Sequence, residues 1–192
     1  MITPLEYVRR LGVGVLAGAI AGLLAGGVGG RLFMSLLANL NPEAAGVQSD
    51  DDFTIGQVTL QGTLNLFTVG TIIGAVGGLV WLGIRGLRFG PRWWRVVSMP
   101  IGVGIVAGSQ MVHAEGVDFN LLEPAWLAVV LTLSVPTAAA FIVSALGDRW
   151  IGSETTVWQH LPAAIPWVVR AGFVALVLVA LNHLVGQVRL IV

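Results

Sequence analysis

The chain has 192 residues, of which 56% are hydrophobic and 10% are charged, and its mean hydropathy is +0.87. Water-soluble domains carry charge on about a quarter of their residues, so this composition excludes a soluble globular fold. The chain has no cysteine, which excludes disulfides, thiolate metal sites and cysteine nucleophiles. The formal net charge is zero, and the uneven placement of the charges along the chain predicts the topology.

Five apolar segments are each about long enough to cross a bilayer as a helix. A helix needs about 20 residues for the hydrocarbon core, and the segments lie near residues 11–30, 63–84, 96–113, 125–146 and 167–188. We therefore predict an all-α protein, a polytopic integral membrane bundle of about five transmembrane helices, in one domain over residues 1–192. We expect the first segment to stay as a helix rather than to be cleaved as a signal peptide.

Small residues recur along the first two predicted helices. The first helix carries Gly14, Gly18, Gly22, Gly26 and Gly30 at every fourth position, with Ala17, Ala21 and Ala25 beside them. The second repeats the spacing with Gly70, Gly74 and Gly78. Such faces let helix backbones approach closely in a membrane, so we expect these two helices to pack through their Gly-rich faces. Because a four-residue step turns about 40° past a full turn, the face spirals and can serve more than one neighbour.

The connections between the predicted helices differ in composition. Residues 41–62 form the longest polar loop, and its second half alternates apolar with polar residues, which favours a short extended segment. Residues 85–95 form a loop that carries four arginines and no acid. Pro100 falls in the first turns of the third predicted helix, and Pro136 near the middle of the fourth, where we expect a kink.

Charge asymmetry predicts the orientation in the membrane. With five spans, one side collects Arg9, Arg10, Arg85, Arg88, Arg92, Arg95, Arg149 and Arg170, while the other has only Arg31 and Arg189. Seven acids divide the opposite way: Glu43, Asp50, Asp51, Asp52, Glu115, Asp118 and Glu123. Under the positive-inside rule the arginine-rich side is cytoplasmic. We predict a bacterial inner-membrane protein with its N-terminus in the cytoplasm and its C-terminus outside.

Polar residues at membrane depth gather near the predicted outer end. The candidate pocket residues are Arg31, Asn65, Gln110, His113, Glu115, Asn182 and His183. Three interpretations stay open for them: interfacial anchoring, with Arg31 paired to a loop acid; a solute or ion pathway; and a metal or haem site at His113 and His183. We predict no cofactor, and keep the metal or haem site as an alternative.

The arginine-rich loop has two interpretations of its own. Arg85, Arg88, Arg92 and Arg95 lie beside a predicted span, which is typical of a site for anionic lipid headgroups. The same residues also act as topology determinants under the positive-inside rule, and we favour that second interpretation.

Short stretches of the sequence carry a resemblance to other proteins. The stretches are GGRLFM at 29–34, SDDDFTIGQVTLQGTLNL at 49–66 and VDFNLLEP at 117–124. Through them the chain resembles small polytopic membrane proteins of GC-rich bacteria. The resemblance implies a membrane fold and attaches no activity.

These observations lead to one main functional hypothesis and two alternatives. The sequence has no metalloprotease, phosphate-loop or nucleophile-elbow motif, so we do not predict an enzyme. We expect a protein that acts by helix packing, as a homo-oligomer or an accessory subunit of a membrane complex, because the first helix offers more small-residue surface than the second needs. The alternatives are a small-solute or ion transporter with an outer pocket, and a haem- or metal-binding protein. The expected partners are the lipid bilayer and other membrane subunits or copies of itself, and no nucleic acid.

Overall fold

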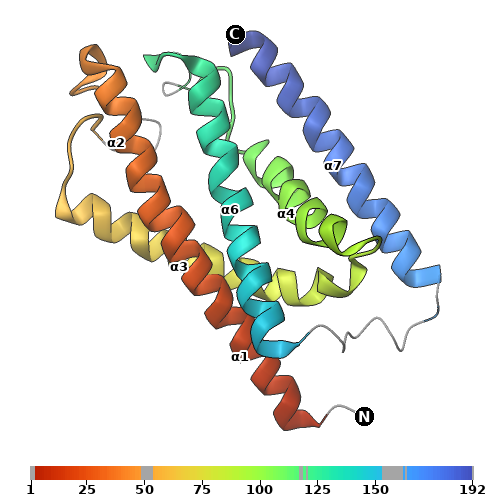
Figure 1. The fold of residues 1–192 in the computed structure, drawn as a ribbon. Coiled ribbons are helices and arrows are strands. Elements are labelled where there is room, and N and C mark those ends of the chain that lie inside the picture. Colours follow the sequence, from red (N-terminus) through yellow and green to blue (C-terminus); the bar gives the residue numbers. More distant parts are fainter. Residues whose placement is uncertain are drawn as a thin grey trace.

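The structure, a computed structural model, describes residues 3–48, 54–116, 119, 121–152, 162 and 164–191. Its elements are α1 (Pro4–Ala21), η1 (Gly22–Gly29), α2 (Gly30–Leu40), η2 (Pro42–Ala44), α3 (Leu60–Ile84), η3 (Arg85–Leu87), α4 (Arg92–Gly108), α6 (Ala125–Ile151) and α7 (Ala164–Ile191). Among the described residues, four helices are long and apolar enough to cross a membrane, and a shorter apolar helix covers Trp93–Gly108. The predicted all-α membrane bundle is confirmed. The start of α1 and the end of α7 lie at opposite ends of the bundle (Figure 1).

The first helix is continuous from Pro4 to Leu40, so it extends past both ends of the predicted span 11–30. At its start the Thr3 hydroxyl accepts a hydrogen bond from the Glu6 N–H at 3.3 Å, and Pro4 occupies the first turn, so the amphipathic lead is already helical. Near its middle the helix passes through the π-helical turns of η1, where the Gly30 N–H reaches back to the Ala25 carbonyl. Its length of about 55 Å exceeds the hydrocarbon core of about 30 Å, so the helix tilts or extends beyond it.

The glycines of the first helix (α1, η1 and α2) and of α3 bring the two backbones into contact. A Cβ atom added to Gly18 would lie 2.7 Å from the Gly78 nitrogen, and one added to Gly22 would lie 2.8 Å from the Gly74 Cα. Neither distance is tolerable for a real Cβ atom, so only glycine permits this approach. The remaining glycines predicted for packing line the same contact, where added Cβ atoms would meet the opposite helix at 2.8–3.3 Å: Gly14, Gly26, Gly30 and Gly70.

The alanine side of α1 faces a second helix, α6. Ala17 and Ala21 are buried in a cluster with Trp81 of α3 and Val143 of α6. A Cβ atom on Gly147 of α6 would lie 2.8 Å from Cζ2 of Trp81 and still closer to Cη2 and Cζ3, so the indole fits only against glycine. The small-residue surface of α1 that does not contact α3 is therefore covered by α6 of the same chain.

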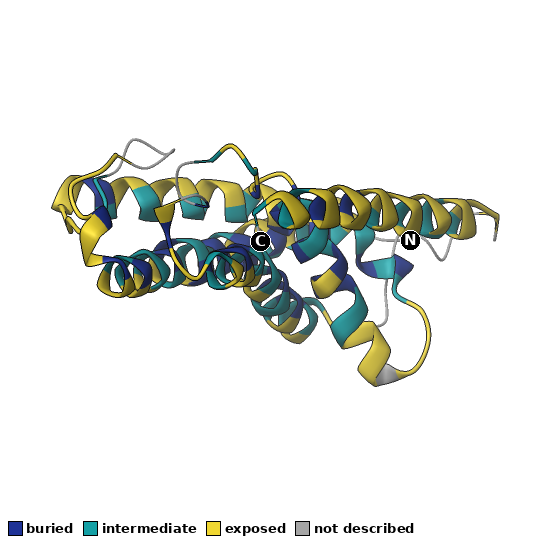
Figure 2. Cartoon of the chain, turned by 90° about the horizontal axis from the view of Figure 1, so that it is seen from above, coloured by how far each residue is buried: buried dark blue, intermediate teal, exposed yellow. Residues whose placement is uncertain are grey.

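Helices α4 and α7 form the other side of the bundle. α4 packs on α6 through glycine, since a Cβ atom on Gly104 would lie 3.0 Å from the Thr137 Cβ and one on Gly108 would lie 3.3 Å from the Leu133 Cγ. α7 lies beside α4 at the edge of the bundle (Figure 1). Only 6% of the apolar stretch of α7 is buried, against 39% for the first helix. Exposed residues cover the outward sides of the helices (Figure 2), as expected for surfaces that face lipid.

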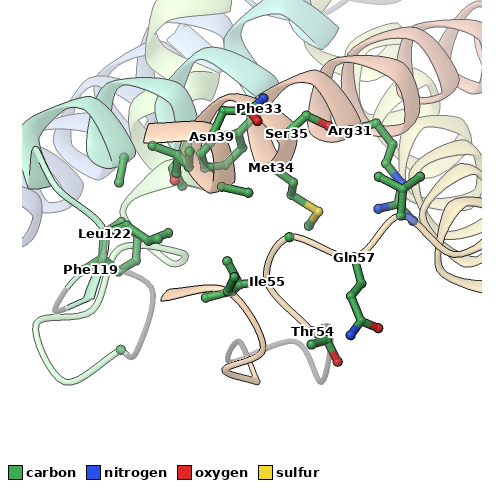
Figure 3. A pocket seen from close by; sticks show the side chains of 18 of the residues that line it. Arg31, Phe33, Met34, Ser35, Asn39, Thr54, Ile55, Gln57, Phe119 and Leu122 are labelled. Atoms are coloured by element: carbon green, nitrogen blue, oxygen red, sulfur yellow. The ribbon is translucent and has the colours of Figure 1, made fainter. Parts of the chain in front are cut away.

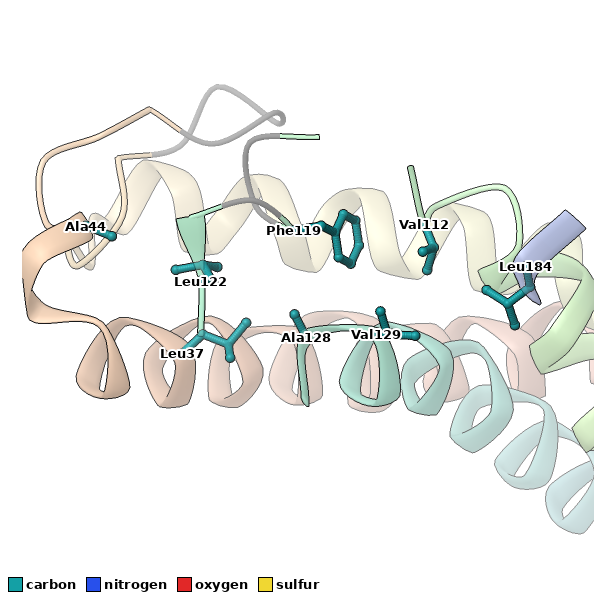
Figure 4. Packing of buried hydrophobic residues seen from close by; sticks show 8 residues of the cluster. All are labelled: Leu37, Ala44, Val112, Phe119, Leu122, Ala128, Val129 and Leu184. Carbon is teal, nitrogen blue, oxygen red and sulfur yellow. The ribbon is translucent and has the colours of Figure 1, made fainter. Parts of the chain in front are cut away.

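A second apolar cluster closes the end of the bundle where α2 stops and α6 begins. Phe119 and Leu122 of the connection before α6 pack with Leu37 of α2, Val129 of α6 and Leu184 of α7 (Figure 4). All five side chains are at least 90% buried. The cluster joins three helices and a connection at one end of the molecule, and it forms the floor beneath the candidate site described below.

Several helix boundaries differ from the predicted ones for identifiable reasons. α3 begins at Leu60 rather than 63 because the Thr59 hydroxyl caps it, accepting from the Gly62 N–H at 3.1 Å. α4 is shifted toward the N-terminus relative to 96–113. It begins after Pro91 and ends at Gly108, where consecutive turn hydrogen bonds follow. Pro100 therefore lies in its interior. α6 continues through Pro136 to Ile151 and stops at Gly152, whose φ of +78° suits glycine.

In the predicted outer loop, the described part holds η2 and one antiparallel bridge between Gln48 and Thr54. The backbone around this bridge is closed by hydrogen bonds from the Gly46 N–H to the Ile55 carbonyl and from the Ile55 N–H to the Val47 carbonyl. Asp50, Asp51 and Asp52 lie outside the described residues.

Candidate functional site

A pocket of about 870 Å³ opens at the end of the bundle where α2 stops. It lies between α2, the segment 54–58 that precedes α3, and the connection between α4 and α6 (Figure 3). In this view Met34 extends from α2 toward the segment that carries Gln57, and Phe119 and Leu122 stand at the opposite side. The pocket mixes an apolar floor with polar side chains: Arg31, Ser35, Asn39, Thr54, Gln57, Gln110, His113 and Thr132.

Arg31 supplies the formal charge of this pocket, and no acidic residue is among its described lining residues. One Nη2 hydrogen of Arg31 reaches the Thr59 carbonyl oxygen at 3.4 Å, which is a long hydrogen bond. The Nε atom is buried and has no hydrogen-bond partner among the described residues. A guanidinium has five donors, so most of its capacity is left for a group that enters the pocket.

Gln110 and His113 reach the pocket from the turn that ends α4. The turn is built by the Ser109 hydroxyl, which donates to the Val106 carbonyl at 2.9 Å, and by the Met111 N–H, which donates to the Gly108 carbonyl at 3.0 Å. The His113 Nδ1 atom lies 3.2 Å from the Met111 carbonyl oxygen. In the tautomer in which Nδ1 donates to that carbonyl, Nε2 is left as an acceptor.

Asn41 joins two of the segments that form the wall of the pocket. Its buried amide donates to the Leu37 carbonyl at 2.9 Å and to the Glu123 carbonyl at 3.0 Å, and its oxygen accepts from the Glu123 N–H at 2.7 Å. These bonds fix the end of α2 to the connection that leads into α6. Asn41 was not predicted to matter for the site. The asparagine just before Pro42, where α2 must end, was the available signal.

Four of the seven predicted pocket residues lie elsewhere. Asn65 is exposed on α3, Asn182 and His183 are exposed on α7, and Glu115 is exposed in the connection after α4. None of these lines the pocket. A neighbouring residue of α7, Gln187, does reach this end, since its side-chain oxygen accepts from the Ala114 N–H at 2.7 Å. The structure thus brings together Arg31, Gln110 and His113.

The histidines predicted as alternative metal ligands are divided between two places. His113 lines the pocket, while His183 lies on the exposed side of α7. No group of three or more His, Asp or Glu side chains that could hold a metal ion occurs in the described part of the chain. Asp118, an acid predicted on this side, lies outside the described residues.

The arginine-rich loop at the opposite end makes contacts inside the chain. Arg88 forms a two-pronged ion pair with Asp148 of α6, with both N–O distances 2.6 Å. Arg85 is 97% buried, stacks over Trp81 at 5.1 Å and donates to the Gly152 carbonyl. Arg95 is exposed. Of the four predicted headgroup residues, Arg85 and Arg88 therefore hold the end of α6, and the side chain of Arg92 is outside the described residues.

Among the described lining residues, the pocket carries one arginine with hydroxyl and amide side chains around it. Such a pocket can bind a small anion by charge and hydrogen bonding. Its described residues offer no nucleophile with an adjacent base. No protein-family model, curated protein or solved structure matches this chain.

Proposed function

We propose that this integral membrane protein recognises a small anionic solute in the pocket around Arg31, as the binding step of transport or uptake. The observation that supports this most is the partly buried guanidinium of Arg31, which has one long hydrogen bond and a buried Nε without a partner among the described residues. A buried polar group without a partner needs an explanation, and an anion that accepts from the Arg31 Nε–H provides one. Gln110 and Thr132 supply further hydrogen-bond donors in the same pocket.

The test compares Arg31→Gln with Arg189→Gln, which removes an exposed arginine from the end of α7. Thermal unfolding of the purified full chain is measured with inorganic phosphate, sulfate and short carboxylates. A ligand at 100 times its Kd stabilises a protein by about 2.7 kcal/mol. We expect one class of anion to raise the Tm of the wild type and of Arg189→Gln, and to leave Arg31→Gln unchanged. Equal responses in all three proteins would contradict the proposal.

Transport itself is tested by flux into proteoliposomes of the anion that gives the stabilisation. Flux should be lost in Arg31→Gln and reduced in Gln110→Ala, while both variants stay folded. Binding without flux would restrict the function to solute binding.

A second candidate, self-association or attachment to another membrane subunit, is supported by α7. Asn182 is exposed on this helix among exposed apolar residues, Leu178, Val179 and Val185. It lies nine positions before the end of α7, about 14 Å along the helix axis. An amide that faces lipid at such depth gains from hydrogen bonding to a partner helix, by about 1 kcal/mol.

Asn182→Leu is the variant that tests this candidate, and Asn65→Leu, at an exposed position of α3, is its control. The oligomeric state of each is measured in lipid nanodiscs at several protein-to-lipid ratios. We expect Asn182→Leu alone to reduce association. A wild type that stays monomeric and purifies without a partner subunit would contradict this second candidate.

A further inference from the structure

A narrow apolar groove lies between α4 and α7, on the arginine-rich side of the molecule. Its volume is about 300 Å³. Its walls include Trp94, Ile101 and Ile105 from α4 and Phe173, Val174 and Val177 from α7. The groove extends along α7 from Arg170 to Val177, about 10 Å of helix axis. It therefore runs from the end of the bundle into the membrane-spanning part.

Arg170 stands at the head of this groove in a fixed position. Its Nε donates to the Leu87 carbonyl at 2.9 Å, and its guanidinium lies 5.5 Å from the Phe89 ring centre and 4.9 Å from the Trp167 ring centre. The two rings themselves are 6.3 Å apart. Contacts of a guanidinium with aromatic faces are favourable, so the side chain is oriented before any ligand arrives.

Among the described residues that line the groove, the two Nη groups of Arg170 are the arginine donors that make no hydrogen bond within the chain. The other arginine that lines it, Arg88, uses Nη1 and Nη2 on Asp148 and Nε on the Arg85 carbonyl. Among the described residues, the hydrogen bond that Arg170 donates comes from its Nε alone. No described residue that lines the groove is acidic. The guanidinium fork matches a phosphate in two-pronged geometry.

Depth in the membrane identifies the kind of phosphate. Arg170 is six positions after the start of α7, about 9 Å along the axis, beside the aromatic residues Trp94 and Trp167 that suit the membrane–water boundary. A cation at headgroup depth, above an apolar groove that leads into the bilayer, fits a phospholipid with its phosphate on the arginine and an acyl chain below. The arginine Arg95 on the same side favours a headgroup with net negative charge.

From this geometry we infer that the groove between α4 and α7 is a site for an anionic phospholipid, with its phosphate on Arg170 and one acyl chain along Ile101 and Val174. The site is separate from the Arg31 pocket and does not depend on a solute binding there. It also replaces the headgroup assignment of Arg85 and Arg88, whose side chains serve contacts within the chain.

The test measures lipid adducts of the purified full chain by native mass spectrometry. Phosphatidylglycerol and phosphatidylcholine with identical acyl chains are titrated, together with inorganic phosphate as a chain-free probe. We expect phosphatidylglycerol to bind most tightly. Arg170→Gln should weaken that binding about fivefold to tenfold, the effect of removing one arginine at a membrane surface. Arg149→Gln, an exposed arginine on the same side, should change it less than twofold.

A second pair of variants separates lipid binding from damage to the fold. Val174→Trp fills the groove and leaves Arg170 in place, whereas Val179→Trp adds the same bulk at an exposed position of α7 outside the groove. We expect only Val174→Trp to lose the adduct, with Tm values in lipid-free detergent close to that of the wild type. Equal binding of both lipids, equal loss in Arg170→Gln and Arg149→Gln, or retention in Val174→Trp would overturn the inference. Tight binding of inorganic phosphate alone would identify a free-anion site and overturn it as well.

Discussion

The buried side chain of Asn41 links the end of α2 by hydrogen bonds to the segment that leads into α6. Its three hydrogen bonds use both oxygen and nitrogen of the amide, and two of them satisfy the backbone N–H and carbonyl of Glu123. Backbone polar groups inside a protein need such partners. Because Asn39, Arg31 and Leu122 line the pocket on either side of this junction, the position of Asn41 also determines the shape of the pocket.

At this residue scale we predict that Asn41→Ala lowers the free energy of unfolding by about 1–2 kcal/mol, because it leaves the partly buried backbone N–H and carbonyl of Glu123 unpaired. Unfolding of the full chain in mixed micelles with increasing dodecyl sulfate measures the change. Asn39→Ala, at an exposed position two residues earlier, is the control and should change stability by less than about 0.5 kcal/mol. Equal stability of the two variants would show that the Asn41 bonds do not hold the junction.

Among the elements, the contact between α1 and α3 depends on glycine at particular positions rather than on glycine content. α3 holds two adjacent glycines with opposite environments. A Cβ atom on Gly78 would lie 2.9 Å from the Gly18 Cα, whereas one on Gly77 would meet nothing within 4 Å. One turn earlier, a Cβ atom on Gly74 would lie 2.6 Å from the Gly22 Cα.

We therefore predict opposite effects for two alanine substitutions in one helix. Gly74→Ala forces α1 and α3 apart and should lower the free energy of unfolding by about 2 kcal/mol or more. Gly77→Ala should be neutral or stabilising by up to about 1 kcal/mol, because alanine favours helix over glycine. The same micelle titration ranks both variants against the wild type. A Gly77→Ala protein as unstable as Gly74→Ala would mean that the two helices pack in a different register.

The helical membrane class could be predicted from hydropathy and glycine spacing, because in a bilayer apolar length and backbone hydrogen bonding leave few alternatives. The depth of each polar residue along its helix could be estimated in the same way. The side of the helix that faces the centre of the bundle could not be predicted. Arg31, Gln110 and His113 share the pocket, whereas Asn65, Asn182 and His183, placed at the same end by sequence, face outward. Which side of a helix faces the pocket depends on which helices pack together. The contacts of Gly104 with Thr137 and of Trp81 with Gly147 show this packing, and neither contact can be predicted from the sequence of one helix alone.

On the scale of the whole molecule, the polar contacts between elements lie at the two ends of the bundle. Arg88 with Asp148 and Arg170 with the Leu87 carbonyl join elements at one end. Asn41 with Glu123 and Gln187 with Ala114 join elements at the other. The end that carries the Arg31 pocket is thus separate from the end that carries the Arg170 groove. The proposed solute site outside the cell and the proposed lipid site in the cytoplasmic leaflet both require that the helices between these ends cross the membrane.

The claim that the helices cross the membrane is tested most directly by thiol labelling on the two sides of α3. The chain has no cysteine of its own, so each introduced thiol is the sole site of labelling. Gln57→Cys and Pro91→Cys place single thiols at exposed positions before and after α3 and η3, and a membrane-impermeant maleimide is applied to intact spheroplasts. We predict that Gln57→Cys reacts at once and that Pro91→Cys reacts only after the membrane is permeabilised. Reaction of both from the same side would show that α3 does not span. Reaction of Pro91→Cys alone would place the Arg31 pocket in the cytoplasm.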